Sequence, residues 1–358
     1  MAAFGAATGT AADNPNNDIL VSNPPNDGIS SLAFSPRALA PKNFLVAGSW
    51  DNGVRCWEVQ QSGQTVPVGM IEHSAPVLDV TWREDGQAIF SAGCDKQAKM
   101  WSIATNQNQV IAQHDAPISK IAYLNDVGNG TPCVVTGSWD KTLKYWDIRA
   151  PTGSPMGVVP MPERVYAMDA RGALLVVGTA DRKILVYDVR KPTQPYLDKL
   201  SQLKYQTRVI ACFPDQRGFA VGSVEGRVSI DHVQQSDRPN DFAFKCHREE
   251  NNIYSVNSIA FHEGYGTFAT AGSNGTFIFW DKDSKQRLKN FKKLLQPITA
   301  SCFSADGSIY AYAVGYDWSK GAEGHVAGSK NYILLHGVQD AEVRGKDKQA
   351  KPGLFSGK

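Results

Sequence analysis

A turn built around an acidic or amide residue recurs along this chain of 358 residues at nearly constant spacing. The turn ends an apolar run, as in FLVAGSWD at 44–51 and CVVTGSWD at 133–140. Its marker residues are Asp51, Asp95, Asp140, Asp181, Glu225, Asn274 and Asp317, which stand 44, 45, 41, 44, 49 and 43 residues apart. A repeat of roughly 40–45 residues with Trp-Asp endings is typical of propeller blades. This periodicity constrains the fold more than any single segment does.

Each repeat contains the same order of strand-like runs. One apolar run leads into the marker turn, and an alternating run follows it, as in GVRCWEV at 53–59 and TLKYWDI at 142–148. Another apolar run precedes each pair, and helical periodicity is absent. Short β-rich runs joined by Gly, Asp and Asn turns predict strand–turn–strand units. We therefore predict an all-β, seven-bladed β-propeller, whose closed ring leaves few exposed sheet edges.

The last repeat breaks the pattern. In four other repeats a tryptophan stands six residues after the marker, but Trp318 follows Asp317 directly. A long insertion separates the strand-like runs SIYAYAV and NYILL, and no fourth strand follows them. We expect DILV at 18–21 to supply that strand, so that the N-terminal strand closes the last blade. The predicted limits are a flexible N-terminal leader at 1–17, the propeller at 18–338 and a basic polar C-terminal tail at 339–358.

The overall composition argues against several classes of protein but does not identify a partner. A formal net charge of +2 points to no class of partner. No apolar run approaches the ~20 residues that cross a membrane, and the N-terminus does not read as a secretory signal. The six cysteines contain no C-x-x-C pair, which argues against a zinc ribbon. We expect reduced, buried thiols in the cytosol or nucleus, with no metal and no cofactor.

Two sets of side chains resemble Ser-His-Asp triads. They are His73 with Ser91 and Asp95, and His114 with Thr136 and Asp140. Nucleophilic catalysis needs a base beside a hydroxyl and an acid that orients the base. The same set recurs in successive blades, however, and each ends on Trp101 or Trp146. We therefore predict buried hydrogen-bond networks, no catalytic residues and no enzymatic activity.

The residue before each marker stands at the tip of its turn. These residues are Trp50, Cys94, Trp139, Ala180, Val224, Ser273 and Tyr316. Large aromatic side chains at such tips are either sheltered by blade packing or exposed as binding anchors. Arginines near the same face suit an acidic, partly apolar peptide. The predicted peptide-binding residues are Trp50, Trp139, Arg164, Arg208, Arg227 and Tyr316.

A second cluster combines aromatic and basic residues. It comprises DFAFKCH at 241–247 and WDKDSKQRLKNFKK at 280–293, and the latter carries six basic residues. One interpretation is a solvated outer strand. The other is contact with single-stranded RNA, in which cations neutralise phosphates and a ring stacks on a base. The candidate residues are Phe242, Phe244, Trp280, Lys282, Lys285 and Arg287, although Trp280 also occupies the position of the blade's structural tryptophan.

Several longer stretches carry a family resemblance. They are PKNFLVAGSWDNGVRCWEVQ, IAQHDAPI, TGSWDKTLKYWD, GSVEGRV, FKCHR and GYDWSKG. The chain resembles the WD40 mRNA export factors of the nuclear pore, the Rae/Gle type. The general WD40 pattern covers roughly residues 18–338 and is specific in blades one to three and six. The match to the export factors spans essentially the whole propeller, and GYDWSKG and FKCHR are its most specific parts. In blade four Tyr187 replaces the tryptophan, and in blade five Asp231 does.

The resemblance implies a non-enzymatic scaffold with two partners. A GLEBS segment of a phenylalanine-glycine nucleoporin would cross the aromatic and arginine face, and messenger RNA would bind elsewhere. The implied locations are the nucleus, the nuclear pore complex and the nuclear envelope, with shuttling to the cytoplasm. It implies no membrane insertion and no small-molecule substrate.

Two other functions stay open. A mitotic-checkpoint WD40 adaptor that binds kinase segments would share the same face, although FKCHR and the basic residues of blade six argue against it. A cullin ubiquitin-ligase substrate receptor would carry a W-D-x-R pattern, which WDIR at 146–149 fits. Four residues of this kind arise easily in such repeats.

Overall fold

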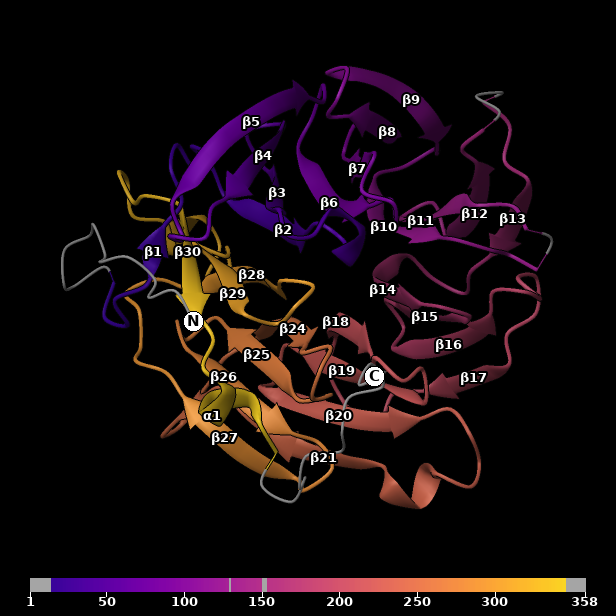
Figure 1. The fold of residues 1–358 in the computed structure, drawn as a ribbon. Coiled ribbons are helices and arrows are strands. Elements are labelled where there is room, and N and C mark those ends of the chain that lie inside the picture. Colours follow the sequence, from indigo (N-terminus) through magenta and orange to yellow (C-terminus); the bar gives the residue numbers. More distant parts are fainter. Residues whose placement is uncertain (1–13, 129, 150–152, 346–358) are drawn as a thin grey trace, which may run out of the picture.

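The chain folds into a closed ring of antiparallel sheets (Figure 1). The structure is a computed structural model that describes residues 14–128, 130–149 and 153–345. Within these residues the strands form seven four-stranded sheets and one two-stranded ribbon. The predicted all-β, seven-bladed propeller is confirmed.

The blades follow one another along the chain. Blade one contains β2 (Ile29–Phe34), β3 (Asn43–Ser49), β4 (Gly53–Val59) and β5 (Thr65–Glu72). Blade two contains β6 (Val77–Trp82), β7 (Ile89–Gly93), β8 (Gln97–Ser102) and β9 (Gln107–Gln113). Blade three contains β10 (Ile118–Leu124), β11 (Cys133–Ser138), β12 (Thr142–Asp147) and β13 (Gly157–Pro160). Blade four contains β14 (Val165–Arg171), β15 (Leu174–Thr179), β16 (Lys183–Asp188) and β17 (Leu197–Leu200).

The remaining blades complete the ring. Blade five contains β18 (Thr207–Cys212), β19 (Gly218–Ser223), β20 (Arg227–His232) and β21 (Phe242–Lys245). The ribbon of β22 (Arg248–Glu249) and β23 (Asn252–Ile253) comes next. Blade six contains β24 (Val256–Phe261), β25 (Phe268–Gly272), β26 (Phe277–Asp281) and β27 (Gln286–Asn290). Blade seven contains β28 (Ile298–Phe303), β29 (Ile309–Val314), β30 (Tyr332–Gly337) and β1 (Ile19–Leu20), and a short helix α1 (Asp340–Val343) follows.

The core lies between the blades. The second strands, such as β11 and β15, are buried along their whole length because neighbouring blades cover both of their faces. Phe90 of blade two and Trp146 of blade three share one cluster and are at most 3% exposed. A strand that is buried on both faces reads as a continuous apolar run, which is why FLVAGS and CVVTGS do not alternate.

Polar side chains on the innermost strands join neighbouring blades. The hydroxyl of Ser30 donates to the carbonyl of Val77 at 2.7 Å, which links blades one and two. The carboxylate of Asp79 accepts from the Ser31 hydroxyl at 2.8 Å and from the Ile121 amide at 3.1 Å. Asp79 therefore holds blade two to both of its neighbours. A buried polar group without such partners costs about 1–3 kcal/mol.

The N-terminal strand closes the ring as predicted. Strand β1 pairs antiparallel with β30, beside β29 and β28. The amide of Val21 donates to the carbonyl of Ile333 at 2.9 Å, and Val21 is fully buried. The indole of Trp57 in blade one donates to the carbonyl of Ser22 at 2.8 Å. The closing segment thus contacts both the last blade and the first.

One histidine joins the two ends of the described chain. His336 of β30 lies with its Nδ1 2.7 Å from Asp18 and its Nε2 2.9 Å from Glu342 of α1. Asp18 also accepts from the hydroxyl of Tyr312 at 2.5 Å, and Lys289 of β27 lies 4.0 Å from Glu342. Both ring nitrogens face a carboxylate, so the imidazole is held as a cation.

Packed residues extend just beyond the predicted propeller limits at both ends. The side chain of Asn14 bonds to the backbone of Asp18, and both residues are buried. Val343 is 2% exposed, and its carbonyl accepts from the Thr267 hydroxyl of blade six at 2.8 Å. The rest of the predicted leader, 1–13, and of the tail, 346–358, lies outside the described residues.

The charged histidine predicts that stability falls as the solution becomes alkaline. Burial alone lowers the pKa of His336, but hydrogen bonds and charge from Asp18 and Glu342 raise it to about 9. The protonated form therefore stabilises the fold fully below pH ~6.5, and this contribution is lost as pH rises towards ~9. We expect Tm of the wild type to fall by roughly 3–6 °C across this window.

The variant His336→Gln should remove most of this pH dependence, measured by calorimetric melting at several pH values. His325→Gln is the control, because His325 is exposed and contacts neither terminus. A slope of Tm against pH that is the same in wild type and His336→Gln would contradict the charged link.

Candidate binding surfaces

The turns between second and third strands lie on one side of the ring, which we call the turn face. Six of the seven tip residues are tied through their backbone amides to the segment that precedes their blade's first strand, and in blade seven the neighbouring Gly315 makes this bond. The amide of Trp50 donates to the carbonyl of Gly28 at 2.9 Å, and the amide of Ala180 donates to the carbonyl of Arg164 at 2.9 Å. Tip residues and the residues before the first strands therefore share this face.

Two of the three predicted aromatic anchors are exposed on the turn face. Trp50 is 46% exposed and Trp139 is 37% exposed, so blade packing does not shelter either side chain. Tyr316 is half-buried, and its hydroxyl donates to the carbonyl of Gly321 at 2.7 Å. Among the tip residues of the other blades, none is a large aromatic.

The predicted arginines differ in their surroundings. Arg208 is exposed at a bulge in β18, and Arg227 begins β20 at the same end of blade five. The guanidinium of Arg227 lies 3.7 Å from the Glu225 carboxylate. Arg164 pairs with Glu163 at 3.4 Å and lies over the ring of Tyr166. Arg208 has no ion pair within the described part of the chain.

The sequence reading missed the ribbon β22–β23 on the turn face. The Arg248 guanidinium at its start donates to the carbonyls of Glu225 and Gly226 at 2.7 and 3.3 Å. It therefore fixes the blade-five turn that precedes Arg227. The residues Glu249 to Asn252 at its turn are polar, and a four-residue hairpin of this kind has no strong sequence signal.

The predicted RNA cluster assembles at the seam of blades five and six. The rings of Phe244 and Trp280 lie 4.7 Å apart, and those of Phe242 and Phe244 lie 6.0 Å apart. All three rings pack against the core between the blades. The Trp280 indole also donates to the Thr270 hydroxyl at 2.9 Å, so it serves as the blade's structural tryptophan.

The three cations of this cluster are not equivalent. The Lys282 side chain is only 9% exposed, pairs with Asp283 at 2.6 Å and lies over Phe213. The Lys285 ammonium lies 4.8 Å over the ring of Phe242 and is exposed, as is Arg287 on β27. Lys285 and Arg287 therefore present charge to solvent, whereas Lys282 is already neutralised.

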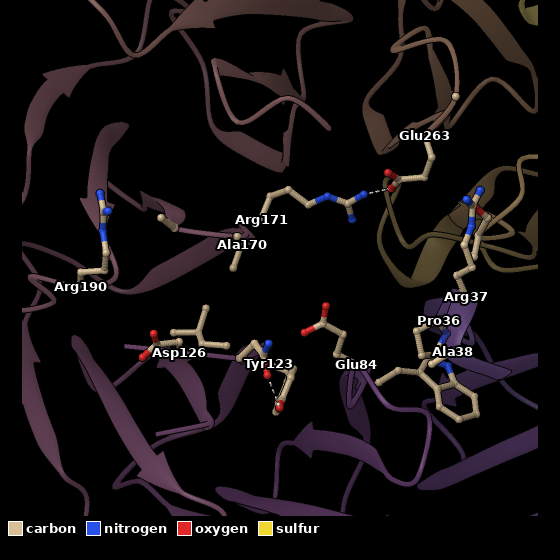
Figure 2. A pocket seen from close by; sticks show the side chains of 17 residues that line it. Pro36, Arg37, Ala38, Glu84, Tyr123, Asp126, Ala170, Arg171, Arg190 and Glu263 are labelled. Carbon is tan, nitrogen blue, oxygen red and sulfur yellow. Dashed lines mark hydrogen bonds and ion pairs between the residues drawn. The ribbon is translucent and has the colours of Figure 1, made fainter. Parts of the chain in front are cut away.

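A funnel opens at the centre of the face opposite the turns. Its volume is about 1170 Å³, and its lining comes from the ends of the first strands of several blades. Figure 2 shows the Arg171 guanidinium reaching the Glu263 carboxylate across it. Its charged lining residues are Arg37, Arg171, Arg190, Glu84, Asp126 and Glu263. These charges balance, so the funnel favours neither a polyanion nor a polycation.

The triad-like sets are structural networks, as predicted. His114 is 3% exposed, with Nδ1 2.8 Å from Asp140 and Nε2 2.8 Å from the Thr136 hydroxyl. The Trp146 indole donates to that hydroxyl at 2.8 Å. Burial lowers the pKa of His114 despite the nearby charge of Asp140. The hydroxyl is thus engaged on two sides and is not exposed as a nucleophile.

The other two networks vary this arrangement. In blade two His73 bonds to Asp95 and Ser91 as expected, but the Trp101 indole donates to Asn106 at 3.2 Å instead of to the serine. The sequence reading missed a third network in blade six. There His247 lies 2.9 Å from both Asn274 and Thr270, and burial lowers its pKa to about 4.

The described residues carry no sign of a metal or redox site. All six cysteines are free thiols, and burial raises the pKa of Cys56 to about 12. No group of three or more His, Cys, Asp or Glu side chains in this part of the chain is placed to hold a metal ion. No helix within the same residues has the length and apolar character to span a bilayer.

Comparison with known proteins places the chain in a family. The family described as "WD domain, G-beta repeat" matches residues 16–58, 65–102, 105–147 and 242–281. The first match begins near β1, the outer strand of blade seven, and the last begins at β21, the outer strand of blade five. Each sequence repeat therefore spans the outer strand of one blade and the inner strands of the next.

Three curated relatives match almost the full chain. The "mRNA export factor GLE2" of Chaetomium thermophilum is 46% identical and covers 95% of this chain and 97% of that protein. The "Poly(A)+ RNA export protein" of Schizosaccharomyces pombe is also 46% identical, and the match covers 98% of this chain and 100% of that protein. The chain belongs to the WD40 mRNA export factor family. A third member, "Protein RAE1" of Arabidopsis thaliana, is 50% identical and covers 99% of both chains.

Membership of this non-enzymatic family agrees with the geometry. The repeat matches fall on blades one to three and six, where the resemblance is specific. Blade four and the three inner strands of blade five, with Tyr187 and Asp231 in place of tryptophan, lie outside them, as does most of blade seven with its insertion. The two predicted binding sites are not tested by the family assignment and stay predictions.

The histidine networks predict which marker acids matter for stability. Asp140→Ala leaves the buried His114 without one partner, so we expect the free energy of unfolding to fall by about 1–3 kcal/mol. Asp181→Ala is the matched control, since Asp181 occupies the same turn position in blade four and bonds to Thr179 without a histidine. Denaturant unfolding of both variants measures the difference, and equal losses would contradict this role.

Proposed function

We propose that this WD40 scaffold docks a GLEBS segment of a phenylalanine-glycine nucleoporin on its turn face and binds single-stranded RNA, and so supports mRNA export through the nuclear pore. The relatives' names support the export role. The observation that carries the docking proposal is one surface with two exposed tryptophans and two arginines at the end of blade five.

The arginines supply the charge that an acidic segment needs. Arg208 and Arg227 lie at the same end of one blade, and the ribbon residue Arg248 fixes the turn between β19 and β20. Two guanidinium groups that converge on a carboxylate form charge-assisted hydrogen bonds. Losing one partner of such a pair typically costs about 2–5 kcal/mol when the pair is desolvated.

The tryptophans supply the apolar part of the contact. Trp50 of blade one and Trp139 of blade three stand on the same face with blade two between them, so a bound segment would contact large aromatic rings at two places along the ring. Aromatic residues of this kind are enriched among those that dominate binding energy. Arg164 and Tyr316 complete the proposed surface.

Arg208→Ala and Arg227→Ala should each weaken binding of a synthetic GLEBS peptide at least tenfold, measured by calorimetry. The reason is the loss of a charge-assisted partner to a peptide glutamate. Arg217→Ala is the control, because Arg217 lies at the other end of blade five and pairs with Asp237. If both arginine variants bind the peptide with wild-type affinity, the peptide does not bind at these arginines.

The proposed RNA site depends on the exposed part of the aromatic and basic cluster. Lys285 and Arg287 would contact phosphates, and the half-buried edge of Phe242 would offer a ring to a base. Phe244, Trp280 and Lys282 support this surface from beneath, since each is already packed or paired.

Lys285→Glu with Arg287→Glu should weaken binding of an unstructured oligonucleotide, and the slope of log K against log salt should flatten by about 0.7 per lost phosphate contact. Lys282→Ala should have a smaller effect because Lys282 is paired with Asp283. The measurement is fluorescence anisotropy at several salt concentrations. Unchanged affinity at low salt in the double variant would contradict the RNA site and favour the interpretation of this cluster as a solvated surface.

The proposed location is the nucleus and nuclear pore complex, including the nuclear envelope, with shuttling to the cytoplasm. The ubiquitin-ligase alternative is weakened because Arg149 of WDIR forms a two-point pair with Asp147, at 2.8 and 3.0 Å. A pull-down in which a checkpoint kinase or a ligase adaptor outweighs nucleoporins would favour the alternatives.

A further inference from the structure

The insertion in blade seven builds an aromatic stack on the turn face. Residues 315–331 connect β29 and β30 where other blades have a tight turn. The rings of Trp318 and His325 lie 5.6 Å apart and are nearly parallel, and Tyr316 lies 5.6 Å from Trp318. Trp318 is 54% exposed and has a φ of 58°, a left-handed conformation that is unusual for a bulky residue.

Side-chain hydrogen bonds fix this insertion against blade six. Asp317 accepts from the Asn257 amide at 2.9 Å and from the Ser273 hydroxyl. The Tyr316 hydroxyl accepts from the Lys320 amide at 3.2 Å while it donates to the Gly321 carbonyl. The strained backbone at Trp318 is therefore held in place by its neighbours, as is common at functional sites.

A notch lies between the insertion and blade six. We call it the blade-seven notch, and its volume is about 290 Å³. Its apolar lining residues are Tyr254, Leu295, Pro297, Tyr316 and Val326. Leu295 is 72% exposed and Val326 is 67% exposed. The tip residues Ser273 and Tyr316 also line it, so the notch opens onto the turn face.

The charge around the notch is positive. Lys293 and Lys320 line it, and no carboxylate does. Lys293 pairs with Glu249 at 2.7 Å, whereas Lys320 has no ion pair among the residues that the structure describes. An apolar side chain with a carboxylate beside it in sequence would therefore match both the lining and its charge.

We propose that the blade-seven notch holds one apolar side chain of the acidic peptide on the turn face, so that Leu295 and Val326 form a second anchor beside the blade-five arginines. This inference rests on the proposed function. At about 290 Å³ the notch lies at the lower limit of the ~300–1,000 Å³ of pockets that hold a whole small molecule, so it has room for one large side chain. A nucleobase fits less well, because Lys293 already lies over the ring of Tyr254, and Trp318 and His325 already cover one face of each other.

Calorimetry with the GLEBS peptide tests the proposal directly. Leu295→Asp and Val326→Asp place a negative charge in the notch, and each should weaken peptide binding at least tenfold. Trp318→Ala should weaken it by a smaller factor, because Trp318 supports the notch through Tyr316. Val110→Asp is the matched control, since Val110 is 46% exposed on the outer strand β9, away from the turn face. It should bind the peptide like the wild type.

The outcomes separate this inference from the proposed function. If the wild type does not bind the peptide, both are wrong. If Arg227→Ala weakens binding while Leu295→Asp and Val326→Asp match Val110→Asp, the notch is not an anchor but the docking face stands. If the notch variants lose affinity for oligouridylate and keep it for the peptide, the notch serves nucleic acid and the inference is overturned. Because both substituted side chains are exposed, unchanged melting curves are expected.

Discussion

The ring depends on the pairing of β1 with β30. A propeller blade buries its faces only against its neighbours, so an incomplete seventh blade would expose apolar surface on two sides and leave an unpaired edge. Val21 fills this gap, and the Trp57 indole ties the same segment to blade one. The charged His336 then joins this N-terminal segment to α1 through Asp18 and Glu342. Residues more than 300 positions apart thereby hold the same closure.

Tryptophan serves two opposite roles in this molecule, and its position in the repeat decides which. On the third strand, Trp57, Trp101 and Trp146 are at most 3% exposed and lie between blades. At the turn, Trp50 and Trp139 are one residue before the marker and extend into solvent. The turn itself is held by the marker acid and, in three blades, by a buried histidine. Because these networks secure the backbone, the tip side chain is free to contact a partner.

The turn face and the opposite face differ in what they offer. On the turn face, arginines of blade five and the notch of blade seven stand beside exposed aromatic rings. In the funnel of the opposite face, arginines and carboxylates are balanced and Arg171 pairs with Glu263. At the seam of blades five and six, the rings of Phe244 and Trp280 pack against the core, and Lys282 is paired and covered. An acidic, partly apolar peptide therefore has one favourable surface.

The sequence by itself determined the architecture, because each blade repeats the same turn chemistry and strand order, and the missing fourth strand of blade seven left only DILV to complete it. It also distinguished the histidine networks from catalytic triads through their repetition. Only the tertiary structure decided which members of each cluster remain accessible. Lys282 and Lys285 stand three residues apart in one basic run, yet the first is paired and covered while the second is exposed. The repeat pattern of the sequence likewise did not predict the notch or the His336 link. Both join side chains from segments that come together only when the ring has closed.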